Sequence, residues 1–223
     1  MSAGHRVYPV ALLLEAKRCL VVGGGPLAAR KAAQLLDSGA EVTLVAPRLD
    51  PSVEVLAKDR GLLVERRPYT TGEAGGYRLV ITATGTEVDS TVAADSEAAG
   101  VWVNAADDTE NCTFFLPAVH REGAVTIAVS TGGASPALAV WLRDRVATLL
   151  GGGLETAASL LSQARTTLRA AGRRTDSVDW RSLLDGPFST HVHEGHIAEA
   201  SAQIAELLDS PPGRPSVSPG ERP

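Results

Sequence analysis

The sequence predicts an α/β fold, with a Rossmann-like parallel sheet followed by a small α+β segment and a C-terminal helical cluster. Three observations predict it. A short apolar run ends in Gly23-Gly24-Gly25, which open directly into an Ala/Leu-rich segment. Segments rich in β-branched residues then alternate with helix-forming segments as far as residue 104. Beyond residue 117 two short β-rich runs are followed by long amphipathic stretches, a change that indicates a second structural unit.

The glycine cluster lies between an expected strand at 19–22 and an expected helix at 26–37. Its spacing is G-x-G-x-x-A, with Ala28 in the third small position. The first glycine makes a tight turn, the second lets the main chain approach a pyrophosphate, and the small third residue lets the helix pack on the strand. The helix N-terminus favours an anion. We therefore expect cofactor contacts from Gly23, Gly24, Gly25, Pro26 and Leu27.

A second strand is expected at 41–46, about twenty residues after the first glycine. Its end lacks the acidic residue that often bonds the ribose hydroxyls, and Pro47 and Arg48 stand there instead. Arg48 either favours a 2′-phosphate or is an exposed loop residue, and Asp50 is an alternative ribose ligand. The residues alone leave NAD and NADP both open.

The rest of the sheet follows in order. Helices are expected at 53–60 and 88–99, and strands at 62–66, 77–84 and 101–104. The strand at 77–84 ends in small residues, which suits a carboxyl end that touches the cofactor. These positions add three expected cofactor contacts: Thr82, Thr84 and Asn104.

An acidic stretch follows Asn104, where the strands of an open α/β sheet line the ligand crevice. Asp107 is the best-placed carboxylate for catalysis. The alternative is that Asp107, Asp108 and Glu110 form a solvated loop with a helix cap among them.

The second unit begins with a strand, turn and strand at 119–130, and a helix is expected at 137–150. The intervening loop, residues 131–136, either binds an anion or is an ordinary strand-to-helix turn. Gly151-Gly152-Gly153 reads as a hinge, and helices are expected within 154–171 and 189–208, anchored by Trp180 and Phe188. Four histidines, His120, His191, His193 and His196, invite a metal interpretation, but acidic or thiol partners are sparse and we expect no metal site.

The composition of the chain limits the kinds of partner that we expect. A net charge of −5 over 223 residues argues against broad binding to nucleic acids or anionic membranes, so a small-molecule partner is expected. An export signal and a membrane-spanning apolar run are not expected. The two cysteines, Cys19 and Cys112, form no C-x-x-C pair, which indicates a reducing cytoplasm.

Several segments together resemble the family of precorrin-2 dehydrogenase/sirohydrochlorin ferrochelatase, the stand-alone form of the N-terminal half of siroheme synthase. The matching stretches are Tyr8-Pro9-Val10, the glycine cluster through Lys31, Thr82-Ala83-Thr84, Asn104 to Asp108, Phe114 to Ala118, and Ala128 to Ala139. The glycine spacing alone is weak evidence. Joined to the Asn-x-x-Asp and Ser-Thr-Gly-Gly-x-Ser-Pro loops in this order, it is specific.

The resemblance implies NAD-linked oxidation of precorrin-2, a tetrapyrrole, to sirohydrochlorin, and in some members insertion of ferrous iron. It implies a homodimer and makes Asp107 the essential aspartate. It favours NAD over NADP and puts nucleotide contacts on the glycine turn, Pro47 and Arg48. Substrate carboxylates call for basic residues; Arg121 and Arg143 are either these or ordinary surface arginines. Expected substrate contacts are Ser130, Thr131, Gly132, Gly133 and Ser135.

The implied organisation is an NAD-binding domain at 1–113, a dimerisation segment at 114–150, a helical domain at 151–209 and a disordered tail at 210–223. Two alternatives stay open. One is a dehydrogenase that leaves chelation to a separate protein. The other is a Rossmann module that senses NAD(H) without catalysis, which leaves the Asn-x-x-Asp and Ser-Thr-Gly-Gly loops without a purpose.

Overall fold

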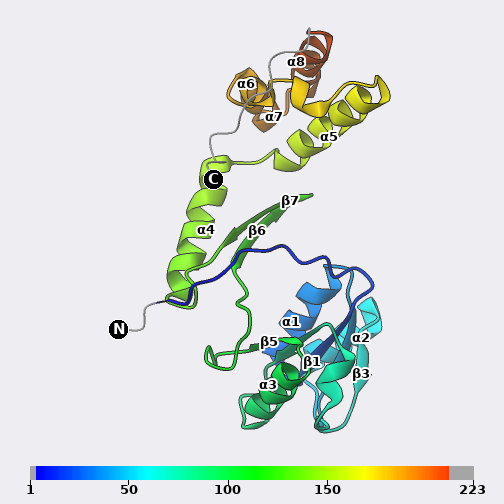
Figure 1. The fold of residues 1–223 in the computed structure, drawn as a ribbon, viewed down its shortest axis with the longest axis vertical. Coiled ribbons are helices and arrows are strands. Elements are labelled where there is room, and N and C mark those ends of the chain that lie inside the picture. The colour runs from blue at the N-terminus through cyan, green and yellow to red at the C-terminus, as the bar shows by residue number, and fades with distance from the viewer. Residues whose placement is uncertain (1–3, 211–223) are drawn as a thin grey trace. The chain divides into compact units, whose positions relative to one another are not determined.

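The computed structural model describes residues 4–210, so the predicted tail beyond Ser210 lies outside the described residues. The chain divides into two compact units (Figure 1). The first comprises Met1–Leu116 with Ser130–Ser135, and the second comprises Pro117–Val129 with Pro136–Pro223. The domain boundaries expected from the sequence remain a prediction.

A five-stranded parallel sheet forms the centre of the first unit, in the order β3-β2-β1-β4-β5. The order reverses between β1 and β4, which is the switch point where open α/β sheets bind ligands. The predicted Rossmann-like sheet is therefore confirmed. The strands are β1 (Arg18–Val22), β2 (Glu41–Val45), β3 (Leu63–Glu65), β4 (Leu79–Thr82) and β5 (Trp102–Ala105).

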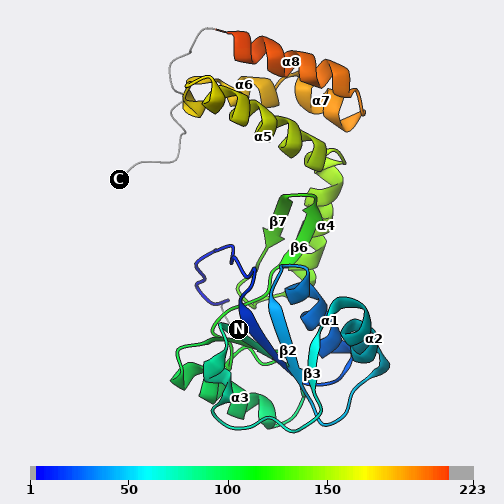
Figure 2. The same ribbon diagram turned by 90° about the vertical axis from the view of Figure 1, so that its right-hand side faces the viewer.

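Helices cover both faces of this sheet (Figure 2). The helices α1 (Pro26–Leu36) and α2 (Pro51–Arg60) share a buried cluster with Cys19 and Val21. Helix α3 (Val88–Ala98) packs in a second cluster with Leu20 and Val22. Side chains alternate between the two faces of a strand, so an apolar run such as β1 supplies both clusters. A short 3₁₀ helix, η1 (Glu73–Gly76), precedes β4.

Helix α2 starts two residues earlier than the sequence pattern predicts. The Asp50 carboxylate accepts a hydrogen bond from the Ser52 backbone N–H at 2.9 Å, and Pro51 occupies the first turn. An aspartate cap followed by proline stabilises a helix start, because the cap satisfies a free N–H and proline lacks one. Capping, and not the apolar periodicity, therefore determines this boundary.

The second unit begins with an antiparallel hairpin of β6 (Ala118–Glu122) and β7 (Val125–Val129). Helix α4 (Pro136–Leu150) packs on the hairpin. A helical cluster follows, in which Phe188 is fully buried and Trp180 packs against the core, so both predicted anchors are confirmed. Its elements are α5 (Leu154–Ala170), η2 (Thr175–Ser177), α6 (Trp180–Leu184), α7 (Pro187–His193) and α8 (Ile197–Asp209).

Glycines with positive φ shape two links in this unit. Gly195, with φ 78°, separates α7 from α8 inside the stretch expected to be helical at 189–208. The segment predicted as a hinge is packed: a Cβ on Gly151 would lie 2.3 Å from the His193 ring. In addition, the Gly153 N–H donates to the Glu122 carboxylate at 2.7 Å. These contacts hold the glycine segment in a defined conformation.

Candidate cofactor and active site

The first two glycines of the turn between β1 and α1 are required by close backbone contacts. Gly23 has φ 130°, and a Cβ there would lie 2.5 Å from the Ala83 carbonyl oxygen, at the end of β4. A Cβ on Gly24 would lie only 1.9 Å from the Arg48 carbonyl oxygen, in the loop after β2. Gly23 and Gly24 therefore lie against the backbone that follows β4 and β2, and only glycine fits at these two positions.

Gly25 differs from its neighbours. Its φ of −87° suits any residue, and a Cβ there would meet nothing within 4 Å. Gly25 is also the N-cap of α1 and provides no side-chain cap, while Pro26 has no N–H to satisfy. The remaining N–H groups of the first helical turn thus border open space, which is the arrangement that binds a phosphate group.

The loop after β2 contains the residues expected to contact the ribose. Pro47 and Arg48 are both exposed, and Arg48 forms no salt bridge with any residue that the structure describes. Asp50 instead serves its own helix: hydrogen bonds from the Ser52 hydroxyl and backbone N–H lower the pKa of its carboxyl group. Of the two ribose candidates, Arg48 has its charge available.

Asp89 organises the loop between β4 and α3, and sequence reasoning missed it. This carboxylate is buried and accepts hydrogen bonds from the hydroxyls of Thr82 and Thr84. The backbone N–H of Gly85 donates to it at 2.9 Å. Thr82 is fully buried with its hydroxyl engaged, and Thr84 is partly exposed at the loop. In the sequence, the one feature that could have indicated this role is an acidic residue in the first turn of a helix, just after the Thr-x-Thr-Gly stretch.

Asp107 lies in a tight turn directly after β5. The Asp108 N–H donates to the Ala105 carbonyl at 3.2 Å, and the Ala106 N–H donates to the Thr82 carbonyl at 2.8 Å. Asp107 has φ 64°, a left-handed conformation that it shares with few non-glycine residues of the described chain. This position of a turn normally takes glycine or asparagine. Aspartate tolerates it at a cost of about 1 kcal/mol, so its presence invites a functional explanation.

The side chains of Asn104 and Cys112 stabilise the Asp107 turn. The buried Asn104 amide donates to the Phe114 carbonyl at 3.0 Å. The Cys112 thiol lies 3.3 Å from the Ala105 carbonyl oxygen and 3.2 Å from that of Asp108, the two ends of the turn. Burial raises the pKa of this thiol, so it stays protonated and can donate. Cys112 is a second residue that sequence reasoning missed, since nothing in its spacing pointed to this role.

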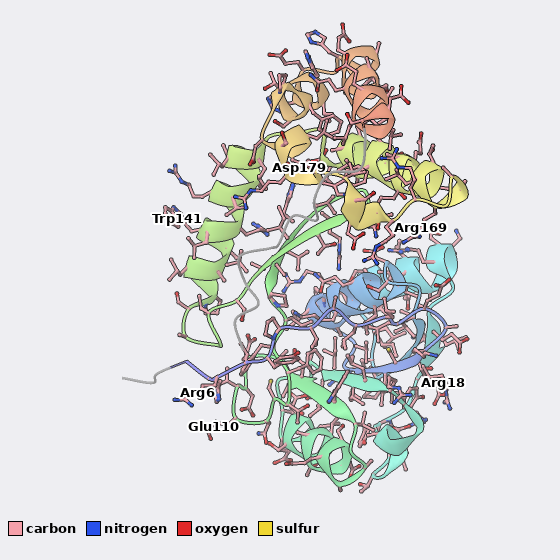
Figure 3. The ribbon with its side chains drawn as sticks, turned by 45° about the horizontal axis from the view of Figure 1, so that its top comes forward. Arg6, Arg18, Glu110, Trp141, Arg169 and Asp179 are labelled. Carbon is pink, nitrogen blue, oxygen red and sulfur yellow. The ribbon has the colours of Figure 1, made fainter. Side chains whose placement is uncertain are left out.

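The two other acidic side chains of this loop, Asp108 and Glu110, are not placed for catalysis. Asp108 accepts a hydrogen bond from the Asn111 side-chain amide at 2.6 Å. Glu110 is exposed and points away from the sheet (Figure 3). The Asp107 carboxylate is exposed at the edge where the strands end. All three carboxylates lie in this loop, and no helix begins between β5 and Ala118 for any of them to cap. Asp107 is the exposed carboxylate next to the strand end.

The second glycine loop, Ser130–Ser135, belongs to the first unit. The Thr131 hydroxyl accepts from the Ser135 N–H and donates to the Ser135 carbonyl, both at 3.0 Å, which closes the loop. Gly132 and Gly133 have positive φ. The His5 N–H donates to the Gly132 carbonyl at 2.8 Å, and the His5 ring lies 5.2 Å from that of Phe115. Sequence reasoning offered no signal for His5.

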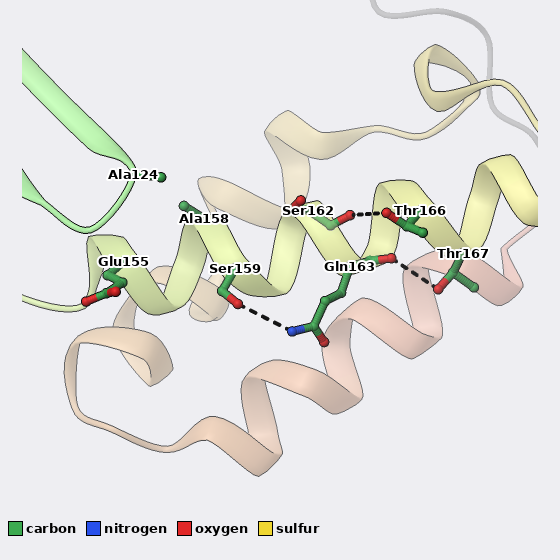
Figure 4. Close-up of a pocket in the computed structure, with 8 residues that line it drawn as sticks. All are labelled: Ala124, Glu155, Ala158, Ser159, Ser162, Gln163, Thr166 and Thr167. Atoms are coloured by element: carbon green, nitrogen blue, oxygen red, sulfur yellow. Dashed lines mark hydrogen bonds between the residues drawn. The ribbon is translucent and has the colours of Figure 1, made fainter. Parts of the chain in front are cut away.

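The second unit contains a hollow of about 600 Å³ on the side of α5 (Figure 4). It contains none of the predicted site residues and only one ionisable group, Glu155, so it offers little for redox chemistry. The lining residues are Ala124, Glu155, Ala158, Ser159, Ser162, Gln163, Thr166 and Thr167. Within residues 4–210, no group of three or more His, Cys, Asp or Glu side chains could hold a metal ion. Over the same range, no helix is both long and apolar enough to cross a membrane.

Fold and glycine turn together define a class: a Rossmann-type protein built to bind a dinucleotide. Residues 10–118 match a family described as "Putative NAD(P)-binding", in agreement with the predicted cofactor. Residues 122–149 match a second family, described as "Sirohaem biosynthesis protein central". These two matches agree with the resemblance to the precorrin-2 dehydrogenase/sirohydrochlorin ferrochelatase family.

Curated relatives carry the same similarity. The chain is 38% identical over 209 residues to siroheme synthase of Chromobacterium violaceum, a match that covers 90% of this chain and 43% of that protein. It is 36% identical to siroheme synthase of Methylococcus capsulatus, over 91% of this chain and 43% of that protein. The chain thus spans less than half the length of these relatives.

A solved structure described as "SirC, precorrin-2 dehydrogenase" has the same fold. It aligns with a TM-score of 0.67 at 23% identity and covers 90% of this chain and all of that one. The predicted fold class, with its parallel sheet, small antiparallel sheet and C-terminal helices, is confirmed.

Proposed function

We propose that this protein oxidises precorrin-2 to sirohydrochlorin with NAD as hydride acceptor. The observation that carries the proposal is the shared position of the glycine turn and the Asp107 turn. Both follow strands of one parallel sheet at its carboxyl edge, β1 and β5, with only β4 between them. Cofactor and proton acceptor would therefore meet at the same edge. The names of the relatives, siroheme synthase and precorrin-2 dehydrogenase, support this substrate class.

The reaction removes one hydride and one proton from the macrocycle as a new double bond forms. NAD, when bound, supplies the hydride acceptor. The first turn of α1 and the space beside Gly25 would bind its pyrophosphate. Asp107 would accept the proton as general base, since its carboxylate is available at the sheet edge. Asn104 and Cys112 would hold the Asp107 turn in position through their contacts with Phe114 and Ala105.

We assign the remaining contacts on the same grounds. The substrate would meet the loop formed by Ser130, Thr131, Gly132, Gly133 and Ser135, which the mutual hydrogen bonds of Thr131 and Ser135 close. Cofactor contacts are proposed for Gly23, Gly24, Gly25, Pro26, Leu27, Pro47, Arg48, Thr84 and Asn104. Thr82, also expected from the sequence, is fully buried with its hydroxyl bonded to Asp89 and supports the loop from inside. NAD is preferred to NADP because the family resemblance outweighs the single charge of Arg48.

Substitution of Asp107 tests the general base without disturbing its turn. Asn and Gly both tolerate the left-handed conformation, so Asp107→Asn and Asp107→Gly should fold normally. We expect kcat for precorrin-2 oxidation to fall by about 10²- to 10⁴-fold in both variants, with NAD affinity unchanged. NADH absorbance measures the rate and calorimetry the affinity. Glu110→Gln is the matched control and should retain wild-type turnover. Wild-type turnover in Asp107→Asn would remove Asp107 from the mechanism.

A second activity, insertion of ferrous iron into sirohydrochlorin, is favoured by the relatives' name, siroheme synthase. Iron would be a substrate of the protein, and Asp107 could accept the pyrrole N–H protons. Sirohydrochlorin and ferrous iron supplied together should give a spectral change faster than the uncatalysed rate. A wild-type dehydrogenase without this change would assign chelation to a separate protein. Absence of both activities, with NAD still bound, would favour the NAD(H)-sensing alternative.

We further propose a cytoplasmic homodimer. Helix α4 supports the dimer, because it buries only Ala139 and exposes large apolar side chains. Trp141 is 57% exposed, on the side of α4 that faces away from β6 and β7 (Figure 3). Val140 and Leu149 are exposed on the same helix. Such an apolar surface suits a second copy of the chain. The free thiols of Cys19 and Cys112 support a reducing compartment.

A further inference from the structure

Lys31 occupies an unusual place on α1. It is half-buried beside Ala28 and Ala32, which pack fully into the core, whereas Lys17 and Lys58, the other two lysines, are exposed. Side chains on a helix lean toward its N-terminus. The Lys31 stem is therefore expected to lean back over the preceding turn of α1.

The Asp107 loop reaches the same face of the sheet. Phe114, at the end of this loop, packs against the cluster that contains Ala28 and Ala32 of α1. The Asp107 carboxylate is close enough to Lys31 to stabilise its positive charge, although it lies beyond salt-bridge distance. Residues far apart in the sequence thus bring a cation and the proposed base to one side of the sheet.

The charge on Lys31 is poorly compensated. Burial lowers the pKa of the Lys31 ammonium, the neighbouring Arg30 guanidinium lowers it further, and the Asp107 carboxylate raises it. Lys31 forms no salt bridge with any described residue. A partly desolvated cation without a counter-ion destabilises the free protein, so its presence points to an anionic ligand.

We infer that Lys31 binds a carboxylate of the tetrapyrrole substrate and holds the macrocycle beside Asp107. The inference rests on the proposed function. Two anions could meet this ammonium, a substrate carboxylate and the cofactor pyrophosphate. The proposed pyrophosphate site is the first turn of α1, at Gly25 and Leu27, whereas Lys31 lies one helical turn further on and its charge interacts with that of Asp107. Arg143, a candidate from the sequence, is already paired with Asp144 at 2.6 Å.

Lys31→Met tests the inference, because methionine keeps the length of the stem and removes the charge. Sirohydrochlorin is the binding probe, followed by its absorbance without NAD, and NAD affinity is measured separately. We expect sirohydrochlorin affinity and kcat/KM for precorrin-2 to fall at least about tenfold, since a charged hydrogen bond is lost. NAD affinity should stay unchanged. Lys31→Arg should restore much of the affinity, and Lys58→Met is the exposed control.

Stability separates a binding role from a structural one. Lys31→Met should melt at or above the wild-type temperature, because the substitution removes a partly desolvated charge. Lys31→Gln provides a second neutral variant if the methionine variant folds poorly. Unchanged sirohydrochlorin affinity in the neutral variants would overturn the inference. A loss of NAD affinity alone would also overturn it and would assign Lys31 to the pyrophosphate. A wild-type protein that neither binds sirohydrochlorin nor oxidises precorrin-2 would instead reject the proposed function.

Discussion

Three adjacent glycines in the first unit have different physical reasons to be glycine. Gly23 and Gly24 lie against carbonyl oxygens of neighbouring loops, so a side chain at either position would displace backbone. Gly25 is open on its outer side and has an ordinary extended conformation. Folding therefore explains the first two glycines. Under the proposed function, the close approach of the cofactor to the main chain explains the third.

Alanine at two of these positions should separate folding from binding. Gly25→Ala should leave the free energy of unfolding unchanged and weaken NAD binding at least about tenfold, about 1.4 kcal/mol, because the methyl group occupies the pyrophosphate space. Gly24→Ala should instead destabilise the fold by about 1–3 kcal/mol, because its Cβ meets the Arg48 carbonyl. Urea denaturation and calorimetry measure the two effects. Unchanged NAD affinity in Gly25→Ala would contradict the cofactor assignment.

At the scale of elements, the segment after β5 is a short loop with a rigid support. Thr113 pairs with Val103 in both directions: its N–H donates to the Val103 carbonyl at 2.9 Å, and its hydroxyl accepts from the Val103 N–H at 2.8 Å. Asn104 and Cys112 add the side-chain bonds described above. The loop therefore leaves the strand and returns to it. An exposed carboxylate on such a loop keeps a defined position without being buried itself.

Removal of the Asn104 amide should loosen this loop. We expect Asn104→Ala to lower the free energy of unfolding by about 1–3 kcal/mol, since the Phe114 carbonyl loses its partner in a partly buried site. Backbone amides of residues 106–113 should exchange hydrogen faster, and kcat should fall as the Asp107 turn becomes mobile. Asn111→Ala, on the outer part of the loop, is the control. Unchanged exchange rates in Asn104→Ala would show that the strand pairing of Thr113 suffices.

At the scale of the whole molecule, the chain consists of two units with different apolar surfaces. The sheet of the first unit is covered by helices on both faces, through two separate buried clusters. In the second unit the helical cluster has its own core around Phe188. Helix α4 contributes little to any of these clusters, which leaves its apolar side chains exposed. The proposed dimer would bury this surface.

A charge on α4 should prevent association without unfolding the chain. Trp141→Glu puts a carboxylate in the proposed interface, and we expect a shift from dimer to monomer at micromolar concentration, because an unpaired charge is costly to bury. Analytical ultracentrifugation measures the mass, and circular dichroism checks that the helices persist. Arg165→Glu on α5 is a charged control away from α4. A monomeric wild-type protein, or a dimeric Trp141→Glu variant, would reject this interface.

The sequence by itself determined the order and type of the elements in the first unit. The glycine turn, the alternating strands and the capped helices are local features, in which spacing and turn chemistry act between residues near in the chain. The position of Asp107 after the last strand also followed from that order. The resemblance to a family then named a chemistry for these residues.

Only the tertiary structure decided which contacts position the side chains of the candidate site. The left-handed turn of Asp107, its support by Cys112, the bonds of Asp89 to the β4 loop and the proximity of Lys31 to Asp107 all depend on contacts between separate elements. No local periodicity encodes such contacts, because they arise when the strands pair and the helices pack. The same packing shows that a side chain at Gly24 would meet the Arg48 carbonyl, while Gly25 borders open space.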